Sequence, residues 1–398
     1  MKNLIGGKFV DASNGEKADV INPATNELID TVPLATEEDV DLCVKEAAKA
    51  QKGWAKMPLH ERGDILYKFA DLVEANHEEL AQLLSKETGK PIKEARAEIS
   101  NTKHFIHGYV EKAKHDYGNV IPAGSEVGQE KTMQITVQQP LGVVACIIPF
   151  NFPCDLFGQK VPSALIMGNS VIVKPSTDNP LTLHRYCELL KDAGVPDGVI
   201  NCISGRGSVT GNALAKHPQV ALISVTGSTE VGAEVMANAA ANITHVMLEL
   251  GGNDAFIVMD DADMELTMKE LVWGRLYNTG QVCCASKRFL VQKGIKDEFI
   301  KKAVETLQSL KVAMPQQEDA DIGCLINEKA AINAEEQVRK TLDQGATLVY
   351  GGRRNGAFFE PTILDNVTKD MDVMKDMEIF APVIPVCTFD TLDEALEI

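Results

Sequence analysis

Two adjacent cysteines, Cys283 and Cys284, lie in a loop-like stretch of sequence, NTGQVCCASKR at residues 278–288. A thiolate is a strong nucleophile, and a cysteine pair flanked by glycine and serine is harder to explain as packing than a cysteine inside an apolar run. A thiol nucleophile needs a base, and the chain has no histidine after His245. A cysteine–histidine hydrolase would have to take its histidine from the first 245 residues, where no motif suggests one.

Glu249 is the more prominent candidate for the base. It lies near the end of an apolar strand and close to two glycines, in the sequence MLELGGND at residues 247–254. A carboxylate in such a position either caps a loop or has a raised pKa, which suits a general base at neutral pH. The residues alone leave both interpretations open.

Two glycine-containing turns could bind the phosphates of a nucleotide. GRGSVTG at 205–211 and GSTEVG at 227–232 each follow an apolar strand and open a helix, as a phosphate-binding turn requires. The first turn has the spacing GxGxxxG rather than the dinucleotide fingerprint GxGxxG, so a plain tight turn explains it equally well. Lys174 ends the strand VIVK, where a ribose or phosphate would lie, although a lone lysine there is more often a solvated charge. Two such turns at neighbouring strand ends together favour a dinucleotide site.

These residues must be placed by a sheet, because apolar strands alternate with helices from residue 120 to residue 250. The alternation predicts an α/β fold with a doubly wound parallel sheet, on which ligands bind beyond the carboxyl ends of the strands. We expect strands at 169–173, 199–203, 220–224 and 244–250, and helices near 181–193, 208–217 and 229–241.

The flanking regions also have readable patterns. Thr36, with Glu38 in the first turn, predicts a helix over 36–54, and the chain from 131 to 149 has the pattern of one long strand that becomes buried. A second α/β region is expected from residue 254, with strands near 254–258 and 287–292 and helices near 263–278 and 295–310.

Composition narrows the classes of function. The 398 residues carry a formal net charge of −18, which repels nucleic acid and anionic membrane surfaces. The N-terminus has no secretory pattern and no apolar run is long enough to span a membrane. Nine cysteines without CxxC spacing argue against a disulfide framework and indicate a reducing cytoplasm. His104 and His107 lack a third ligand and are interpreted as surface residues, so no metal site is predicted.

Six ordered motifs resemble those of the aldehyde dehydrogenase superfamily, and the likeness covers essentially the whole chain. They are PFNFP (149–153), VIVKPS (171–176), GSTEVG (227–232), LELGG (248–252), GQVC (280–283) and EIFAPV (378–383). The resemblance implies oxidation of an aldehyde to a carboxylic acid through a cysteine thiohemiacetal and a thioester, with hydride transfer to NAD or NADP. It implies an NAD(P)-binding domain of residues 1–117 and 140–249 and an oligomerisation hairpin at 118–139. A second α/β domain, the catalytic one, would span 250–398, where family members usually continue further.

The resemblance also implies roles for individual residues. Cys283 corresponds to the nucleophile and Glu249 to the base that activates the thiol or the hydrolytic water. The Asn151 amide and the Cys283 main-chain N–H would form the oxyanion hole. Lys174 and Glu378 would bind the ribose hydroxyls, and Ser228 would lie near the pyrophosphate. The full set expected to contact the cofactor is Ile148, Pro149, Phe150, Lys174, Ser176, Thr177, Gly207, Gly227, Ser228, Leu250, Glu378 and Phe380.

The choice of cofactor is expected to depend on Thr177. Many NAD-preferring relatives carry a glutamate there, which binds the adenosine 2′-hydroxyl and repels a 2′-phosphate. Thr177 has no charge, so NADP should be used at least as well as NAD. Asp178 is adjacent and could restore some repulsion.

The substrate pocket is expected to include Asp155, Gln159 and Cys284. Asp155 and Gln159 lie one turn apart on a helix, and relatives acting on succinate semialdehyde commonly carry arginine near the second position. A carboxylate without a cation predicts a small polar aldehyde, neutral or cationic. Both side chains could instead bond to neighbouring loops and never meet the substrate.

Several alternatives stay open at this level. One is a succinate-semialdehyde dehydrogenase, and another is a coenzyme A-acylating enzyme, which would have no need of Glu249. A silent binding protein on the same scaffold and a thiol hydrolase without cofactor are the others. A homodimer or homotetramer is expected from the resemblance.

Overall fold

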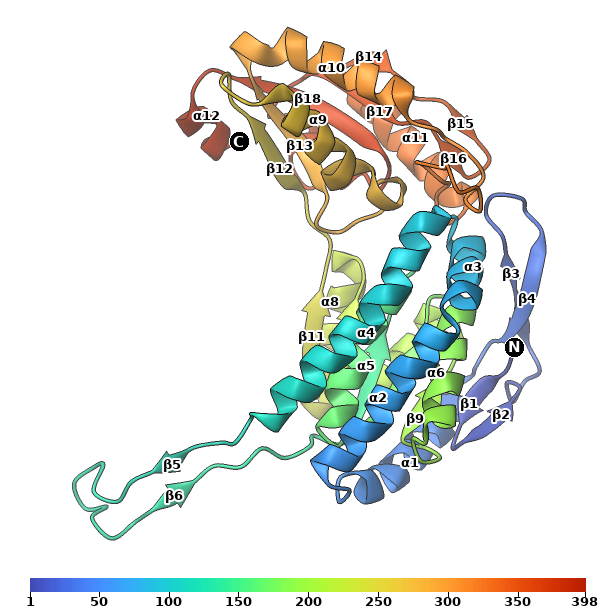
Figure 1. The fold of residues 1–398 in the computed structure, drawn as a ribbon, viewed down its shortest axis with the longest axis vertical. Coiled ribbons are helices and arrows are strands. Elements are labelled where there is room, and N and C mark those ends of the chain that lie inside the picture. Colours follow the sequence, from blue (N-terminus) through green and yellow to red (C-terminus); the bar gives the residue numbers. More distant parts are fainter.

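The chain forms two α/β bodies, and a two-stranded hairpin projects from the first of them (Figure 1). The structure is a computed structural model that describes residues 1–398. A seven-stranded sheet forms the centre of the first body and a five-stranded sheet the centre of the second. The predicted α/β fold class is therefore confirmed.

The seven-stranded sheet has the order β11-β10-β7-β8-β9-β1-β2, and β7 to β11 run parallel within it. Alternate residues of β7 enter different apolar cores: Val144 faces one and Ala145 the other. Strands buried on both faces have continuous apolar sequences, which is why the pattern predicted them. Its strands are β1 (Asn3–Ile5), β2 (Lys8–Val10), β7 (Val143–Ile147), β8 (Ser170–Lys174), β9 (Ile200–Cys202), β10 (Val220–Thr226) and β11 (His245–Glu249).

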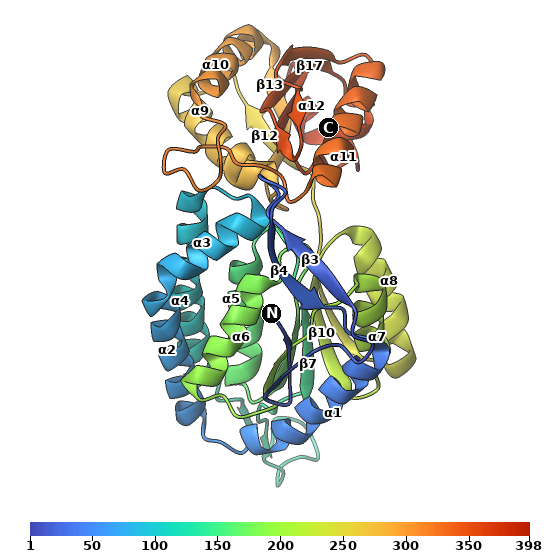
Figure 2. The same cartoon turned by 90° about the vertical axis from the view of Figure 1, so that its right-hand side faces the viewer.

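Helices cover both faces of this sheet (Figure 2). The larger core joins one face to α2 (Leu59–Ala75), α3 (His77–Thr88), α4 (Ile92–Lys114), α5 (Pro153–Ile166) and α6 (Leu181–Ala193). The second core joins the other face to α1 (Glu37–Trp54), α7 (Asn212–Lys216) and α8 (Thr229–Ala239).

The strand order reverses between β7 and β10. From β7 the chain adds β8 and β9 on one side, and it then returns to place β10 and β11 on the other. The carboxyl ends of β7 and β10 therefore lie side by side with their following loops turned apart. In doubly wound sheets this switch point is where ligands bind.

Three predicted boundaries need correction. The chain from 131 to 149 is not one strand, because Pro140 lacks an N–H and Gly142 has φ +132, and pairing stops between Ile135 and Val143. The helix near 208–217 begins as a π turn, and the one near 263–278 ends at Leu271 and continues in π and 3-10 turns. The helix expected over 36–54 is confirmed as α1, where Thr36 is the N-cap and bonds reciprocally with Asp39.

The hairpin consists of β5 (Val120–Ile121) and β6 (Gln134–Ile135), paired antiparallel. It extends away from both bodies (Figure 1). Its apolar side chains are exposed. Nothing within the chain covers those side chains.

The second body has the sheet order β12-β13-β18-β17-β14, with β14 antiparallel to its neighbour. Helices on the two faces of this sheet enclose two separate apolar cores. The strands are β12 (Asp254–Val258), β13 (Ser286–Gln292), β14 (Thr347–Tyr350), β17 (Thr362–Val367) and β18 (Val383–Phe389). The helices are α9 (Met264–Leu271), α10 (Lys296–Ser309), α11 (Glu328–Asp343) and α12 (Leu392–Glu397).

Two small antiparallel pairs complete the fold. One joins β3 (Lys17–Ile21) to β4 (Leu28–Pro33), and the other joins β15 (Arg354–Asn355) to β16 (Phe358–Phe359). None of the helices combines the length and the apolar character that crossing a membrane would require.

Candidate active site

The loop after β7 carries Asn151 at the switch point of the first sheet. Ile148 continues the strand by donating its N–H to the Lys174 main-chain oxygen at 3.0 Å, and α5 begins at Pro153. Asn151 is only 6% exposed. A buried amide must be hydrogen-bonded, so its partners determine where it points.

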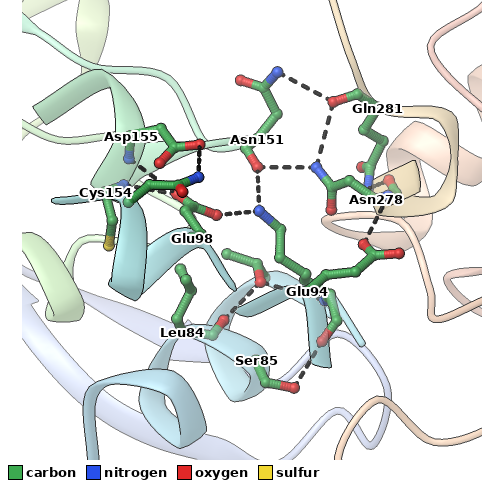
Figure 3. A network of polar contacts seen from close by, with 12 residues as sticks. Leu84, Ser85, Glu94, Glu98, Asn151, Cys154, Asp155, Asn278 and Gln281 are labelled. Carbon is green, nitrogen blue, oxygen red and sulfur yellow. Dashed lines mark hydrogen bonds and ion pairs between the residues drawn. The ribbon is translucent and has the colours of Figure 1, made fainter. Parts of the chain in front are cut away.

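Three hydrogen bonds fix Asn151 (Figure 3). Its main-chain oxygen accepts from Lys90 Nζ at 2.9 Å and from Asn278 Nδ2 at 2.9 Å, and its side-chain Nδ2 donates to the Gln281 main-chain oxygen at 3.1 Å. A side-chain amide has two N–H donors, and only one is used here. The second N–H has no hydrogen-bond partner in the chain, and Gln281, which accepts the first, lies two residues before Cys283.

The loop that carries Cys283 has an unusual backbone. Asn278, Thr279 and Gly280 all have positive φ, at 50°, 55° and 76°. For non-glycine residues this conformation costs ~1–3 kcal/mol each and persists only where the surroundings enforce it. The Asn278 N–H donates to Glu94 at 2.8 Å, and Gln281 Oε1 accepts the N–H of Ile326 at 2.9 Å. These buried bonds hold the loop against Asn151.

Cys283 is half-buried at the end of this loop, and Cys284 is exposed. Burial and the neighbouring Cys284 raise the pKa of the Cys283 thiol, while the ammonium of Lys287 opposes that rise. Lys287 is itself buried, donates to the Cys283 main-chain oxygen at 2.5 Å and pairs with Glu378 at 3.0 Å. A thiol with a raised pKa is mostly protonated at neutral pH, so attack requires a base or a further cation.

The two glycines after Glu249 make room for the neighbouring groups. A methyl group on Gly252 would lie 3.5 Å from the Cys283 main-chain oxygen, and one on Gly251 would overlap the Glu378 carboxylate at 2.2 Å. The LELGG segment thus passes directly beside the cysteine loop and Glu378. Glu249 ends β11 and is exposed, so water can reach its carboxylate.

Lys160 is a further charged group on the Glu249 side of the site. It donates to Ser224 Oγ at 2.9 Å, and burial lowers the pKa of its ammonium while the Glu249 carboxylate raises it. The Glu249 carboxylate therefore lies close enough to Lys160 to favour the charged ammonium.

The residues expected to bind a cofactor lie at the carboxyl ends of the parallel strands. Lys174 ends β8 and is 4% exposed; burial lowers the pKa of its ammonium to about 8. Its Nζ donates to the Pro175 main-chain oxygen at 3.0 Å, which leaves two N–H donors for hydroxyl groups. Thr177 Oγ1 donates to the Gly205 oxygen at 3.3 Å and so joins the two turns that follow β8 and β9.

The remaining cofactor candidates line the same edge. Ser228 caps α8 by accepting the Val231 N–H at 3.4 Å, and the exposed N-terminus of that helix suits an anion. Phe150 and Phe380 meet edge to face, with ring centroids 5.9 Å apart. Side chains and helix ends of this kind fit a dinucleotide with hydroxyl groups, phosphates and a flat ring. The other candidates in this region are Pro149, Ser176, Gly207, Gly227 and Leu250.

Asp155 is more deeply buried than its position on a helix suggests. Burial and the nearby Glu98 raise the pKa of its carboxyl to about 7, with Lys90 opposing them. Its Oδ2 accepts a long bond of 3.5 Å from Asn101, and its Oδ1 is buried without a hydrogen-bond partner. Asp155 is therefore not the permanently charged carboxylate that the sequence predicted, because near neutral pH it is divided between acid and anion. Gln159, one turn on, is exposed.

Sequence reasoning missed the buried residues that support the site. They are Lys90, Glu94 and Glu98, together with Asn278, Gln281 and Lys287. Glu94 and Glu98 are four residues apart and so share one helical face, and that face also holds Ile99 and Thr102. Two carboxylates on the apolar face of a helix were the sequence signal that could have identified these supporting residues.

The comparisons with known proteins agree across the chain. Residues 9–398 match the family described as the aldehyde dehydrogenase family. A D-glyceraldehyde dehydrogenase (NADP(+)) of Picrophilus torridus is 38% identical, with 100% of this chain and 81% of the relative covered. A succinate-semialdehyde dehydrogenase [NADP(+)] of Escherichia coli is 37% identical, over 98% and 80%. A solved structure of 3,6-anhydro-L-galactose dehydrogenase has a TM-score of 0.96 and 36% identity, over 100% and 83%.

The position of Lys287 leads to a prediction about the thiol. In a Cys284→Ala background, alkylation of Cys283 by iodoacetamide reports the fraction of thiolate at each pH. Because the Lys287 ammonium favours the thiolate, Lys287→Met should move the midpoint of alkylation to higher pH. Lys301→Met removes an exposed lysine from α10 and should leave the midpoint unchanged. A midpoint that stays in place or falls in Lys287→Met would show that this charge does not act on the thiol.

Proposed function

The chain belongs to the aldehyde dehydrogenase family and oxidises aldehydes with NAD or NADP, and we propose that Cys283, Asn151 and Glu249 carry out this reaction. The observation that supports the assignment best is the bond from the Asn151 amide to the Gln281 oxygen, two residues before Cys283. It leaves one amide N–H free beside the nucleophile.

In the first step the Glu249 carboxylate takes the proton of the Cys283 thiol and releases it to water. The Cys283 Sγ bonds to the aldehyde carbon, and the electron pair of the C=O π bond moves to the oxygen, which becomes an alkoxide. The free Asn151 N–H and the Cys283 main-chain N–H donate to that oxygen. Losing one such donor typically lowers the rate by ~10²–10³. A nicotinamide cofactor held by Lys174, Glu378 and Phe380 would supply the acceptor for the hydride that leaves the same carbon, and that carbon then becomes an acyl thioester on Cys283.

Hydrolysis then requires an activated water. The Glu249 carboxylate takes a proton from water as the water oxygen attacks the thioester carbon, and the carboxylic acid leaves with release of Cys283. A general base of this kind contributes ~10²–10⁴ in rate. The exposure of Glu249 supports this role because water reaches it freely. A coenzyme A-acylating enzyme would need no such base.

The cofactor residues have separate tasks in this proposal. Lys174, with two free N–H donors, holds ribose hydroxyls at the end of β8, and Glu378 holds those nearer the cysteine. The N-terminus of α8 faces the pyrophosphate. Phe150 and Phe380 enclose the nicotinamide end. The uncharged Thr177 leaves a 2′-phosphate unopposed, which supports use of NADP.

We propose a small polar aldehyde, above all a hydroxyaldehyde, as substrate. The unpartnered Oδ1 of Asp155 is a buried polar atom that a substrate hydroxyl or ammonium group would satisfy. The cation that acts on Asp155 is Lys90, which is already paired with Glu98 and so is not free to bind a distal carboxylate. Two of the relatives are named for glyceraldehyde and anhydrogalactose, both hydroxyaldehydes.

Succinate semialdehyde remains the second candidate substrate. The relative from Escherichia coli that is named for it is as similar to this chain, at 37% identity, as the glyceraldehyde enzyme at 38%. The distal carboxylate of succinate semialdehyde would need a cation from a part of the site that does not adjoin Asp155.

We further propose that the enzyme is a homo-oligomer in a reducing compartment such as the cytoplasm. The hairpin of β5 and β6 exposes Val120, Ile135 and Val137 by 60% or more, and such a row favours pairing with another copy. All nine cysteines are free thiols, in agreement with a reducing environment.

The nucleophile assignment is tested by two neighbouring substitutions. Cys283→Ala should abolish aldehyde oxidation, followed by NADPH absorbance, and should bind NADP with nearly unchanged affinity. Cys284→Ala should keep most of the activity, because that side chain is exposed. The opposite result, with activity retained in Cys283→Ala and lost in Cys284→Ala, would exchange the two roles.

Cofactor choice is tested at Thr177. Thr177→Glu should lower kcat/KM with NADP relative to NAD by ~10–100-fold, because the new carboxylate repels the 2′-phosphate. Thr177→Gln adds the same volume without the charge and serves as the control. If the wild type ignores NADP at saturating aldehyde, the idea is wrong and Asp178 becomes the discriminating residue.

The role of Asp155 is tested with two aldehydes of equal shape, trimethylammonioacetaldehyde and the uncharged 3,3-dimethylbutanal. Asp155 is neutral below its pKa of about 7 and anionic above it. The ratio of kcat/KM for the cationic over the neutral aldehyde should therefore rise ~3–10-fold between pH 6 and pH 8. The ratio cancels ionisations that affect both substrates, and in Asp155→Asn it should be flat.

A flat ratio in the wild type, or a rise that survives in Asp155→Asn, would remove Asp155 from the substrate pocket. Succinate semialdehyde as the best wild-type substrate would contradict the charge argument as a whole.

A further inference from the structure

A buried ion pair lies directly under the Asn151 loop. Lys90 and Glu98 bond through Nζ and Oε2, and both side chains are 0% exposed. Neither residue is expected to touch the aldehyde or the cofactor. Ionised groups are rarely buried completely unless their remaining donors and acceptors are also used.

Every donor of the Lys90 ammonium has a partner. Besides Glu98, it donates to the Asn151 main-chain oxygen at 2.9 Å and lies 4.0 Å above the centre of the Phe152 ring. The backbone of Lys90 is also fixed, since its oxygen accepts from Ser85 Oγ at 2.7 Å and its N–H donates to Thr88 Oγ1 at 3.3 Å. The ammonium is therefore a rigid support for the residues at 151 and 152.

Glu98 acts on the other end of the same segment. Its Oε1 accepts the main-chain N–H of Cys154 at 2.8 Å and of Asp155 at 3.3 Å. These are N–H groups of the first turn of α5, which has no side-chain cap of its own. A carboxylate at a helix N-terminus is stabilised by the helix dipole, so Glu98 serves as a cap supplied by another helix (Figure 3).

The pair thus clamps the segment from Asn151 to Asp155 from both ends. The Asn151 oxygen that accepts from Lys90 also accepts from Asn278, in the loop that carries Cys283. We propose that Lys90 and Glu98 are positioning residues that set where the Asn151 amide lies relative to Cys283. This inference rests on the proposed role of Asn151 in the oxyanion hole.

The test uses a variant without a buried unpaired charge. Lys90→Met with Glu98→Gln removes both charges, while the side-chain amide oxygen that the second substitution introduces still accepts from the first turn of α5. The rate of NADPH formation in a single turnover should fall ~10–100-fold, because misplacing a catalytic group by about 1 Å costs up to ~10². The KM for NADP should change less than ~3-fold, since the cofactor site at β8 and α8 is untouched.

Combination with Asn151→Ala separates positioning from general damage. If the pair acts through the Asn151 amide, Lys90→Met with Glu98→Gln should lower the rate of the Asn151→Ala variant by less than a further ~3-fold. A merely structural role would cause the same loss in both backgrounds. Lys90→Gln with Glu98→Gln keeps a donor for the Asn151 oxygen and should recover part of the rate; it also replaces the Met variant if that one unfolds.

Glu87→Gln is the matched control. Glu87 is another fully buried carboxylate, three residues before Lys90, but it accepts from Leu181 and Thr182 at the start of α6. Glu87→Gln should leave the single-turnover rate unchanged. Thermal unfolding should confirm that every variant folds.

The outcomes distinguish this inference from the proposed function. Two results would overturn this inference alone. One is a normal rate in the Lys90 and Glu98 variants while Asn151→Ala is impaired. The other is a loss caused by the Lys90 and Glu98 substitutions that is equal with and without Asn151→Ala. An undiminished rate in Asn151→Ala would overturn the oxyanion role of Asn151, and the inference with it.

Discussion

The bond between the Asn151 amide and the Gln281 main-chain oxygen joins two parts of the chain that are 130 residues apart. Asn151 follows a strand of the seven-stranded sheet, and Gln281 belongs to the loop that leads into the five-stranded sheet. In the proposed active site, each body supplies residues that the other lacks. Each must be folded correctly for the amide to lie beside Cys283, so the chemistry depends on how the two sheets are docked. The left-handed run from Asn278 to Gly280 is tolerated because that docking enforces it.

Much of this arrangement could be predicted from the sequence. The strands β8, β9 and β10 are largely buried and so appear as short apolar runs. The residues with chemistry follow such strands because ligands bind parallel sheets at the carboxyl edge. The pattern failed where local chemistry outweighs hydropathy. Pro140 and Gly142 interrupt an alternating stretch that would otherwise continue as a strand, and the segment after Leu271 leaves the helix to approach Asn151.

The supporting residues of the site could not be predicted in the same way. Lys90 and Glu98 are only eight residues apart, yet the purpose of the pair depends on a main-chain oxygen 61 residues from Lys90. A side chain that bonds to a distant main-chain atom does not depend on the type of the distant residue, so the contact produces no recognisable sequence motif. The pKa of Asp155 shows the same limit, because its rise depends on burial and on Glu98, neither of which is visible in the turn that contains it.

The contacts of Glu98 with α5 are made to backbone N–H groups and not to side chains. The first turn of that helix is therefore held in place whatever side chain stands at position 155, and Gln159 points to solvent one turn later. In the proposed pocket, substitutions at these two positions would change substrate preference while the main-chain contacts that hold Asn151 beside the Cys283 loop stay in place. Because the substrate-side positions are separate from the contacts that hold the loop, one fold can accept different aldehydes. This agrees with relatives of near-equal identity that are named for glyceraldehyde, succinate semialdehyde and anhydrogalactose.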